Sequence, residues 1–230
     1  MSGSKRSVAA LIFDMDGVIL DTESLVRRCW RQLAPEYGIE QADDLFLQSV
    51  GTTRRHTGEM LCARFGADFP AEAFNSHVSR VFHAIADREG IPLKKGAREI
   101  LQWARAGGIP VGLASSTRQA TVEKELRQAG LYDFFTHVLG GDRIARSKPF
   151  PDIYTAACRA MQVAPHRAIA VEDSYNGIRA AAAAGMQPVM IPDLLPPTGE
   201  MFALCRAVLP DLTQLRSFLS EEHIVSSVSP

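Results

Sequence analysis

Short apolar runs alternate with helical patterns along most of the chain. The runs are rich in branched side chains, which is typical of strands that are buried on both faces of a sheet. These predicted strands are residues 8–13, 109–114, 136–140, 167–171, 188–191 and 207–210. Between them, helical patterns often close on glycine, as helix C-termini do. These predicted helices are residues 97–108, 118–130, 152–162 and 175–185. The alternation predicts an α/β fold with a doubly wound parallel sheet.

One interval breaks this alternation. From about residue 21 to residue 88 the chain reads as helical almost throughout, without the pattern of a buried strand. We interpret it as an inserted α-helical cap domain, so that residues 1–19 and 91–230 form the core and residues 20–90 the cap. The two crossings between them are suited to act as a hinge. Large apolar residues at helical spacing predict the interior of the cap: Trp30, Met60, Phe65 and Phe82.

Composition narrows the class of protein. The chain has 230 residues, with 25 Lys and Arg against 26 Asp and Glu, which gives a net charge of -1. This balance disfavours binding to nucleic acid or to an anionic membrane surface, and no stretch reaches the ~20 apolar residues that cross a bilayer. The N-terminus lacks a signal-peptide pattern, and the four cysteines lack a C-x-x-C pair. We expect a soluble, cytoplasmic monomer with a frayed polar tail at 220–230.

Unusual polar residues lie at or near the ends of the predicted strands. They are Asp14 and Asp16, Ser115, Lys148 in "RSKPFPD", and Glu172 with Asp173. Ligands of open α/β sheets bind beyond the carboxyl ends of the strands, so pairing of these strands would bring the side chains together. Four carboxylates in one cleft raise one another's pKa values unless a cation lies among them. Because no histidine or cysteine is near, these oxygen ligands favour a hard divalent ion, and Mg²⁺ fits best.

The same segments fit phosphoryl transfer, which depends mainly on positioning and on stabilisation of charge. Asp14 and Asp16 are two positions apart on an extended segment, so both project to one side. Gly17 would let the backbone turn away and expose its amides to an anion. Ser115 would offer a hydroxyl, and Lys148 a compact charge for carboxylate and phosphate oxygens. Each feature has an ordinary structural explanation, such as a helix cap, and the functional one rests on their joint order.

Four motifs in order resemble those of the haloacid-dehalogenase-like (HAD) hydrolases that carry a helical cap. They are "DMDGVILDTE" (14–23), "LASSTR" (113–118), "SKPFPDIY" (147–154) and "VEDSYNGIRAAAAAGM" (171–186). The resemblance covers nearly the whole chain. It implies a Rossmann-like core and a Mg²⁺-dependent phosphatase.

The resemblance also implies a role for each motif residue. Asp14 resembles the nucleophile that becomes an aspartyl phosphate, and Asp16 resembles the general acid and base. Asp14, the backbone carbonyl of Asp16, and Asp173 with help from Glu172 are similar to the family's Mg²⁺ ligands. Differing surroundings must keep Asp14 ionised while Asp16 carries a proton.

Other residues would meet the substrate. Ser115 and Lys148 resemble the clamp on the transferring phosphate. The candidate substrate-binding residues are Gly17, Glu23, Arg54, Ser116 and Asn176. In related sugar-phosphate enzymes an arginine at the position of Arg54 faces the active site, but an exposed arginine at a helix start is the alternative. For Thr22, which is next to Glu23, a position at the start of a helix explains the residue equally well. The same holds for Asn176.

The sequence therefore predicts a phosphatase that acts on a small phosphorylated metabolite: a sugar, polyol or nucleoside monophosphate. Asp16 argues against dehalogenation, because the dehalogenases of the family lack an acid there. One alternative is a β-phosphoglucomutase-like phosphomutase, which Val26 disfavours because those mutases carry a histidine at that position. Another is a non-catalytic, receiver-like phosphoacceptor, although receivers place the phosphoaccepting aspartate on a later strand and lack such a helical insertion.

Overall fold

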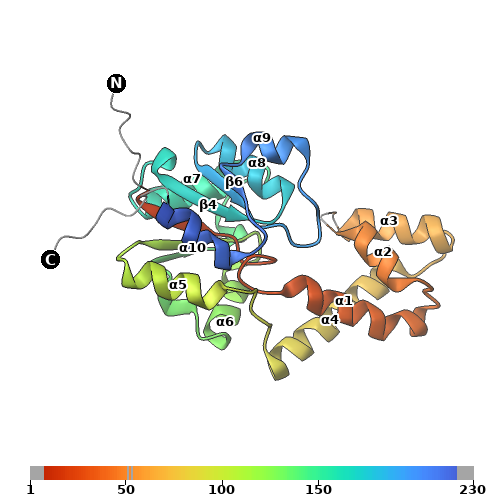
Figure 1. Ribbon diagram of the computed structural model, residues 1–230. Helices are drawn as coiled ribbons and strands as arrows, with labels where there is room; N and C mark the ends of the chain where they lie inside the picture. The colour runs from red at the N-terminus through yellow and green to blue at the C-terminus, as the bar shows by residue number, and fades with distance from the viewer. Residues whose placement is uncertain (1–7, 51, 53, 222–230) are drawn as a thin grey trace. The chain divides into compact units, whose positions relative to one another are not determined.

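The computed structural model describes residues 8–50, 52 and 54–221 (Figure 1). Two compact units divide the chain: Met1–Leu20 with Pro92–Pro230, here called the core unit, and Asp21–Ile91, here called the insert. Of the tail at 220–230, for which we expect fraying, residues 220 and 221 belong to a helix and residues 222–230 lie outside the described residues.

A six-stranded parallel sheet with the strand order β3-β2-β1-β4-β5-β6 forms the centre of the core unit. Its strands are β1 (Ala10–Phe13), β2 (Val111–Ala114), β3 (His137–Leu139), β4 (Ala168–Glu172), β5 (Gln187–Met190) and β6 (Ala207–Val208). Strands β1, β2 and β4 are buried along their whole length, which explains why their sequences are almost continuously apolar. The predicted doubly wound α/β class is confirmed.

Helices cover both faces of this sheet (Figure 1). On one side lie α7 (Asp152–Ala160), α8 (Tyr175–Ala183) and α9 (Gly199–Leu204). On the other side lie α5 (Ala97–Ala106), α6 (Gln119–Gln128) and α10 (Leu212–Glu221). Three short 3-10 turns, η2 (Tyr132–Phe134), η3 (Gly141–Arg143) and η4 (Pro165–Arg167), complete the core unit as described. Helices α9 and α10 were not among the predicted elements.

The order of the strands places two acids at one edge of the sheet. Strands β1 and β4 are neighbours, with Phe13 opposite Val171, although they are far apart in the sequence. The chain leaves β1 toward β2 and β3 and then returns to β4 on the other side of β1, which makes this the switch point of the sheet. Asp14 follows β1 directly and Glu172 ends β4, so both acids lie where ligands bind in such folds.

All the regular elements described in the insert are helices, which short loops connect. They are α1 (Thr22–Leu33), the short η1 (Ala34–Tyr37), α2 (Ala42–Ser49), α3 (Arg54–Phe65) and α4 (Ala71–Glu89). The cap of α1 is Asp21 rather than Thr22, because the Asp21 side chain accepts a hydrogen bond from the N–H of Ser24 at 3.4 Å. None of the helices in the described part of the chain combines the length and apolar character that crossing a bilayer requires.

The insert has an aromatic core of its own, centred on Phe74. This side chain is fully buried, and its ring centroid lies 4.9 Å from that of Trp30 and 5.1 Å from that of Tyr37. Edge-to-face pairs of this kind add to the free energy gained from apolar burial. Of the residues that the helical spacing assigned to this interior, Trp30 is buried. The others are half-buried rather than central: Met60, Phe65 and Phe82.

We expect Phe74→Ala to destabilise the insert by about 3 to 5 kcal/mol, because it removes a large buried side chain and leaves a cavity. Urea unfolding followed by the fluorescence of Trp30 measures this loss, in a background in which Trp103, the second of the two tryptophans, is replaced by phenylalanine. Phe82→Ala is the matched control and should cost clearly less, since Phe82 is half-buried. Equal losses would show that Phe74 does not centre this core.

Candidate active site

A buried ammonium group joins the ends of three strands. Lys148 Nζ donates to Asp14 Oδ1 at 2.5 Å, to Glu172 Oε1 at 2.6 Å and to the backbone oxygen of Ala114 at 3.2 Å. These three acceptors match the three protons of an ammonium group. Burial acts to lower the pKa of Lys148, but the charges of Asp14 and Glu172 outweigh it and hold that pKa above its ordinary value. Lys148 therefore stays charged.

Glu172 is the most enclosed acid of the site. Its Oε1 also accepts the Tyr154 hydroxyl at 2.7 Å, and its Oε2 accepts the Ser174 hydroxyl at 3.0 Å and the Asp173 N–H at 3.2 Å. Burial raises the pKa of Tyr154 well above its usual value, so its hydroxyl keeps the proton that it donates. Gly177 packs so closely that a Cβ there would overlap the Glu172 carboxylate. Because a carboxylate has about four lone-pair sites, protein donors fill those of Glu172.

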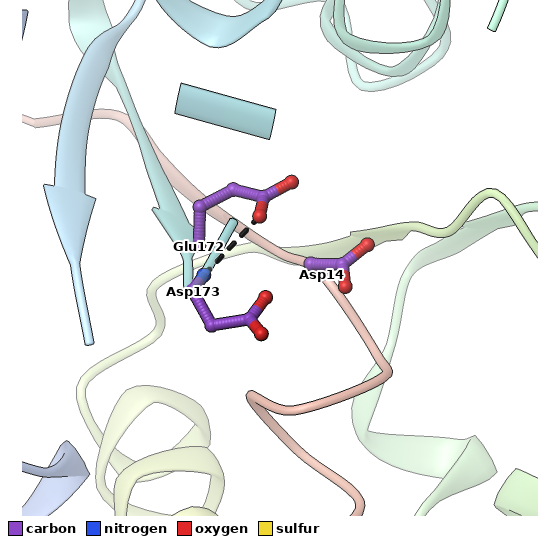
Figure 2. Close-up of side chains that lie close together, drawn as sticks. All are labelled: Asp14, Glu172 and Asp173. Atoms are coloured by element: carbon purple, nitrogen blue, oxygen red, sulfur yellow. Dashed lines mark hydrogen bonds between the residues drawn. The ribbon is translucent and has the colours of Figure 1, made fainter. Parts of the chain in front are cut away.

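Three acids lie within reach of a single cation (Figure 2). Asp14, Glu172 and Asp173 each offer a carboxylate oxygen, and these oxygens lie within 4.8 Å of one another. Figure 2 shows the three side chains gathered at the ends of their strands, with the Asp173 N–H directed to Glu172. Protein donors occupy the oxygens of Glu172. The carboxylates of Asp14 and Asp173 are therefore better suited to bind a cation directly.

The surroundings of Asp14 resist a negative charge. Burial raises the pKa of Asp14 to about 7; Lys148 opposes this, whereas the charges of Glu172 and Asp16 add to it. The side chain is only 9% exposed, so water does little to stabilise its ionised form. A cation near Asp14 would favour the ionised form.

Asp173 also lies among negative charges, of which Asp193 is one. Burial raises the pKa of Asp173 well above its usual value, and the charges of Glu172, Asp14 and Asp193 contribute. Asp193 Oδ1 accepts from Lys94 at 2.7 Å, while its buried Oδ2 has no hydrogen-bond partner among the described residues. Hard oxygen donors with uncompensated charge are what Mg²⁺ prefers. The donor set therefore fits a divalent cation.

Two hydroxyl groups from the end of β2 hold Asp16. Ser115 Oγ donates to Asp16 Oδ2 at 3.3 Å, and Thr117 Oγ1 donates to the same oxygen at 2.8 Å. Ser115 is fully buried, and its Oγ accepts the N–H of Thr117 at 3.0 Å. The sequence singled out Ser115 but missed Thr117, because a further hydroxyl just before a helix looks like an ordinary cap.

Gly17 lies at a turn that leaves no room for a side chain. Its φ of 77° lies in the left-handed region, and a Cβ there would overlap Asp173 Oδ2. Glycine is therefore required both by the turn and by the close approach of Asp173. Its N–H donates to the backbone oxygen of Leu20 at 2.9 Å. The Gly17 N–H is thus used within the turn, and contact of the other amides of this segment with an anion stays a prediction.

The remaining candidates of the core unit are exposed. Ser116 lies on the surface next to Ser115. Asn176 lies in the first turn of α8, also exposed, and its Oδ1 accepts from Arg179 at 3.2 Å. Contact of either residue with substrate stays a prediction.

Two candidates belong to the insert. Glu23 lies in the first turn of α1. Arg54, at the start of α3, donates to Glu72 at 2.5 Å and 3.2 Å and to Ser76 at 2.7 Å, so its guanidinium is already paired within the insert. Binding of substrate by Arg54 would require this exposed pair to open, which costs little in water.

Comparison with known proteins identifies the family. The model of the haloacid dehalogenase-like hydrolases matches residues 8–185. The chain belongs to this family. It is therefore an enzyme of the HAD hydrolases, and the resemblance drawn from its four motifs is confirmed.

Relatives of this HAD hydrolase include sugar-phosphate phosphatases. The phosphorylated carbohydrates phosphatase of Thermotoga maritima is 32% identical over 184 residues, which are 78% of this chain and 83% of that protein. The fructose-1-phosphate phosphatase YqaB of Escherichia coli is 30% identical over 183 residues, covering 79% and 95%. A HAD family hydrolase from Deinococcus radiodurans, solved with bound phosphate and sodium, has a TM-score of 0.82 at 26% identity, covering 96% of this chain and 99% of that chain.

We expect Glu172→Ala to lower the free energy of unfolding by about 3 to 5 kcal/mol, because it removes one partner of a buried ion pair. Lys148 and Tyr154 would each lose an acceptor that water cannot easily replace. Chemical denaturation without added metal measures the change. Glu123→Ala, which removes a partly exposed partner of Arg127 on α6, should cost less than about 1 kcal/mol. A similar loss in both variants would contradict a structural role for Glu172.

Proposed function

We propose that this HAD hydrolase is a Mg²⁺-dependent phosphatase, which hydrolyses a small phosphomonoester through an aspartyl phosphate, the acyl phosphate formed on Asp14. The observation that carries the proposal is the buried pair of Asp14 and Lys148 at 2.5 Å, with Asp16 two residues further along the chain. The relatives named for phosphorylated carbohydrates and for fructose 1-phosphate support a sugar or polyol phosphate as the substrate. Nucleoside monophosphates belong to the same chemical class.

The first step transfers the phosphoryl group to the protein. An oxygen of Asp14 attacks phosphorus, the bond from phosphorus to the ester oxygen breaks, and its electron pair stays on the leaving oxygen. Asp16 gives a proton to that oxygen, so that an alcohol leaves rather than an alkoxide. Lys148 holds Asp14 in place for the attack, and Ser115 redirects its hydroxyl toward the phosphate.

The second step restores the enzyme. Asp16, now ionised, accepts a proton from a water molecule as that water attacks phosphorus. The bond between phosphorus and the Asp14 oxygen breaks, which returns the electron pair to the carboxylate and releases inorganic phosphate. Asp16 is protonated again at the end of the cycle, so one residue serves as acid and then as base.

Asp14 and Asp173, with the backbone carbonyl of Asp16, are the ligands that we propose for Mg²⁺. A bound Mg²⁺ supplies positive charge that offsets the clustered carboxylates and the phosphate oxygens. Glu172 acts one step further out, since its oxygens already accept bonds from Lys148 and Tyr154. This arrangement refines the ligand set inferred from the family motif.

The deciding experiment is phosphate release from a panel of sugar, polyol and nucleoside monophosphates, with Mg²⁺ and with EDTA. We expect release by the wild type only with metal, and a loss of about 10³-fold or more in Asp14→Asn because the nucleophile is gone. Asp133→Asn makes the same chemical change at an exposed position and should leave release unaltered.

Three other outcomes would replace this proposal. Release that continues in EDTA would rule out the metal requirement. Conversion of one sugar phosphate isomer into another with a bisphosphate activator would favour a phosphomutase. A lasting phosphoaspartate without release of phosphate would favour a receiver-like phosphoacceptor.

We also propose that Arg54 of the insert contributes to substrate binding. Arg54→Ala should raise KM for the preferred substrate by about 10-fold or more and change kcat little, since a hydrogen bond to a charged group is lost in ground and transition states alike. Initial rates across substrate concentrations measure this split.

Two variants distinguish binding by Arg54 from a role in the stability of the insert. Glu72→Gln removes the ion-pair partner of Arg54 but keeps the guanidinium, so KM should not rise. Arg64→Ala, at the other end of α3, should also leave KM unaltered. A rise in KM for all three variants would point to stability instead.

A further inference from the structure

Thr117 is a side chain of the site for which the proposed mechanism has no role so far. Its hydroxyl donates to Asp16 Oδ2 at 2.8 Å, which is the shorter of the two hydroxyl contacts to that oxygen. It lies between β2 and α6, two residues after Ser115. Asp16, the general acid and base of the proposed mechanism, thus accepts a hydrogen bond from Thr117, a residue without an assigned role.

Hydrogen bonds of its own backbone hold the segment that carries Thr117. The Thr117 N–H donates to Ser115 Oγ at 3.0 Å, and the Thr117 carbonyl accepts from the N–H of Gly141 at 2.8 Å. Gly141 packs so closely that a Cβ there would overlap the backbone oxygen of Ser116. Thr117 therefore stands on a segment that is tied down on both sides, as a positioning group requires.

Ser115 cannot hold Asp16 throughout the reaction. A serine hydroxyl can donate one hydrogen bond, and we expect Ser115 to donate it to a phosphate oxygen when substrate binds. Its bond to Asp16, at 3.3 Å, is then lost. The shorter bond from Thr117 remains and keeps the carboxylate oriented.

We propose that Thr117 is a positioning residue that orients Asp16 for proton transfer to the leaving oxygen; this inference rests on the proposed phosphatase function. Because Asp16 Oδ2 accepts the hydroxyl proton of Thr117, the proton that Asp16 transfers is carried by Oδ1. In the transfer, the bond from Asp14 oxygen to phosphorus forms and the ester bond to phosphorus breaks. The electron pair of the ester bond stays on the leaving oxygen, which takes the proton from Asp16.

The need for this proton depends on the leaving group. An alkoxide is strongly basic and leaves poorly unless it is protonated, whereas p-nitrophenolate is weakly basic and leaves without a proton. Loss of orientation at Asp16 should therefore slow the hydrolysis of a sugar or polyol phosphate and spare that of p-nitrophenyl phosphate. A general loss of structure would slow both.

The test is kcat/KM of Thr117→Val with two substrates: p-nitrophenyl phosphate and the alkyl phosphate that the wild type hydrolyses best. This constant covers the steps up to departure of the leaving group, so later hydrolysis of the phosphoaspartate does not enter. We expect a loss of about 10- to 100-fold for the alkyl phosphate, part of the typical worth of general acid catalysis, and less than about 3-fold for p-nitrophenyl phosphate.

Three further variants complete the design. Thr117→Ser keeps a hydroxyl and should restore the alkyl phosphate rate to within about 3-fold of the wild type. Asp16→Asn should show the same dependence on leaving group in stronger form. Thr155→Val makes the same substitution at an exposed position of α7 and should change neither rate. If Thr117→Val unfolds at the assay temperature, Thr117→Ala provides the same comparison.

Equal losses on the two substrates, an unaltered alkyl phosphate rate, or failure of Thr117→Ser to restore it would overturn this inference alone. Absence of hydrolysis by the wild type on both substrates would overturn the proposed function, and this inference with it. The ratio of kcat/KM for the alkyl phosphate to that for p-nitrophenyl phosphate therefore tests the role of Thr117. Hydrolysis by the wild type tests the proposed phosphatase function.

Discussion

The structure of the site depends on one buried positive charge. Lys148 donates hydrogen bonds to Asp14, to Glu172 and to the backbone oxygen of Ala114. Asp14 directly follows β1, whereas Glu172 ends β4 and Ala114 ends β2. The ammonium group of a side chain that is only 7% exposed is stable only if such acceptors surround it. The same bonds hold Asp14 at the end of β1. The cost of leaving the charge unpaired therefore fixes the geometry around Asp14 more firmly than loops alone would.

This constraint divides the acids into two kinds. Glu172 accepts bonds from Lys148, Tyr154 and Ser174 and is fully buried, so it serves the structure of the site. Asp14 and Asp173 have fewer compensating donors, and burial raises the pKa of each. They are the acids that gain most from a bound cation. The three carboxylates therefore differ in function, and the hydrogen-bond partners of each one distinguish them.

The sequence predicts features that depend on local patterns of residues better than contacts between residues that are distant in the chain. Buried parallel strands require apolar residues on both faces, so β1, β2 and β4 could be found to within two residues, together with the polar groups at their ends. Contacts such as that of Tyr154 with Glu172 join segments that only the folded sheet brings together. The contact of Thr117 with Asp16 also joins distant segments, and from the sequence alone this hydroxyl looks like an ordinary helix cap. At Gly17 the sequence indicates that a turn occurs but not which backbone oxygen accepts the N–H.

The division of the chain into two units has a chemical consequence. All the side chains that the proposed phosphoryl transfer uses belong to the core unit, from Asp14 to Asp173. The insert is stabilised by its own aromatic cluster around Phe74, and some of its ion pairs, such as that of Arg54 with Glu72, are exposed. Exposed pairs contribute little to stability, so residues on the surface of the insert can change without loss of its fold. If Arg54 binds substrate as proposed, substrate preference can vary through the insert while the buried charges of the core unit keep the reaction the same.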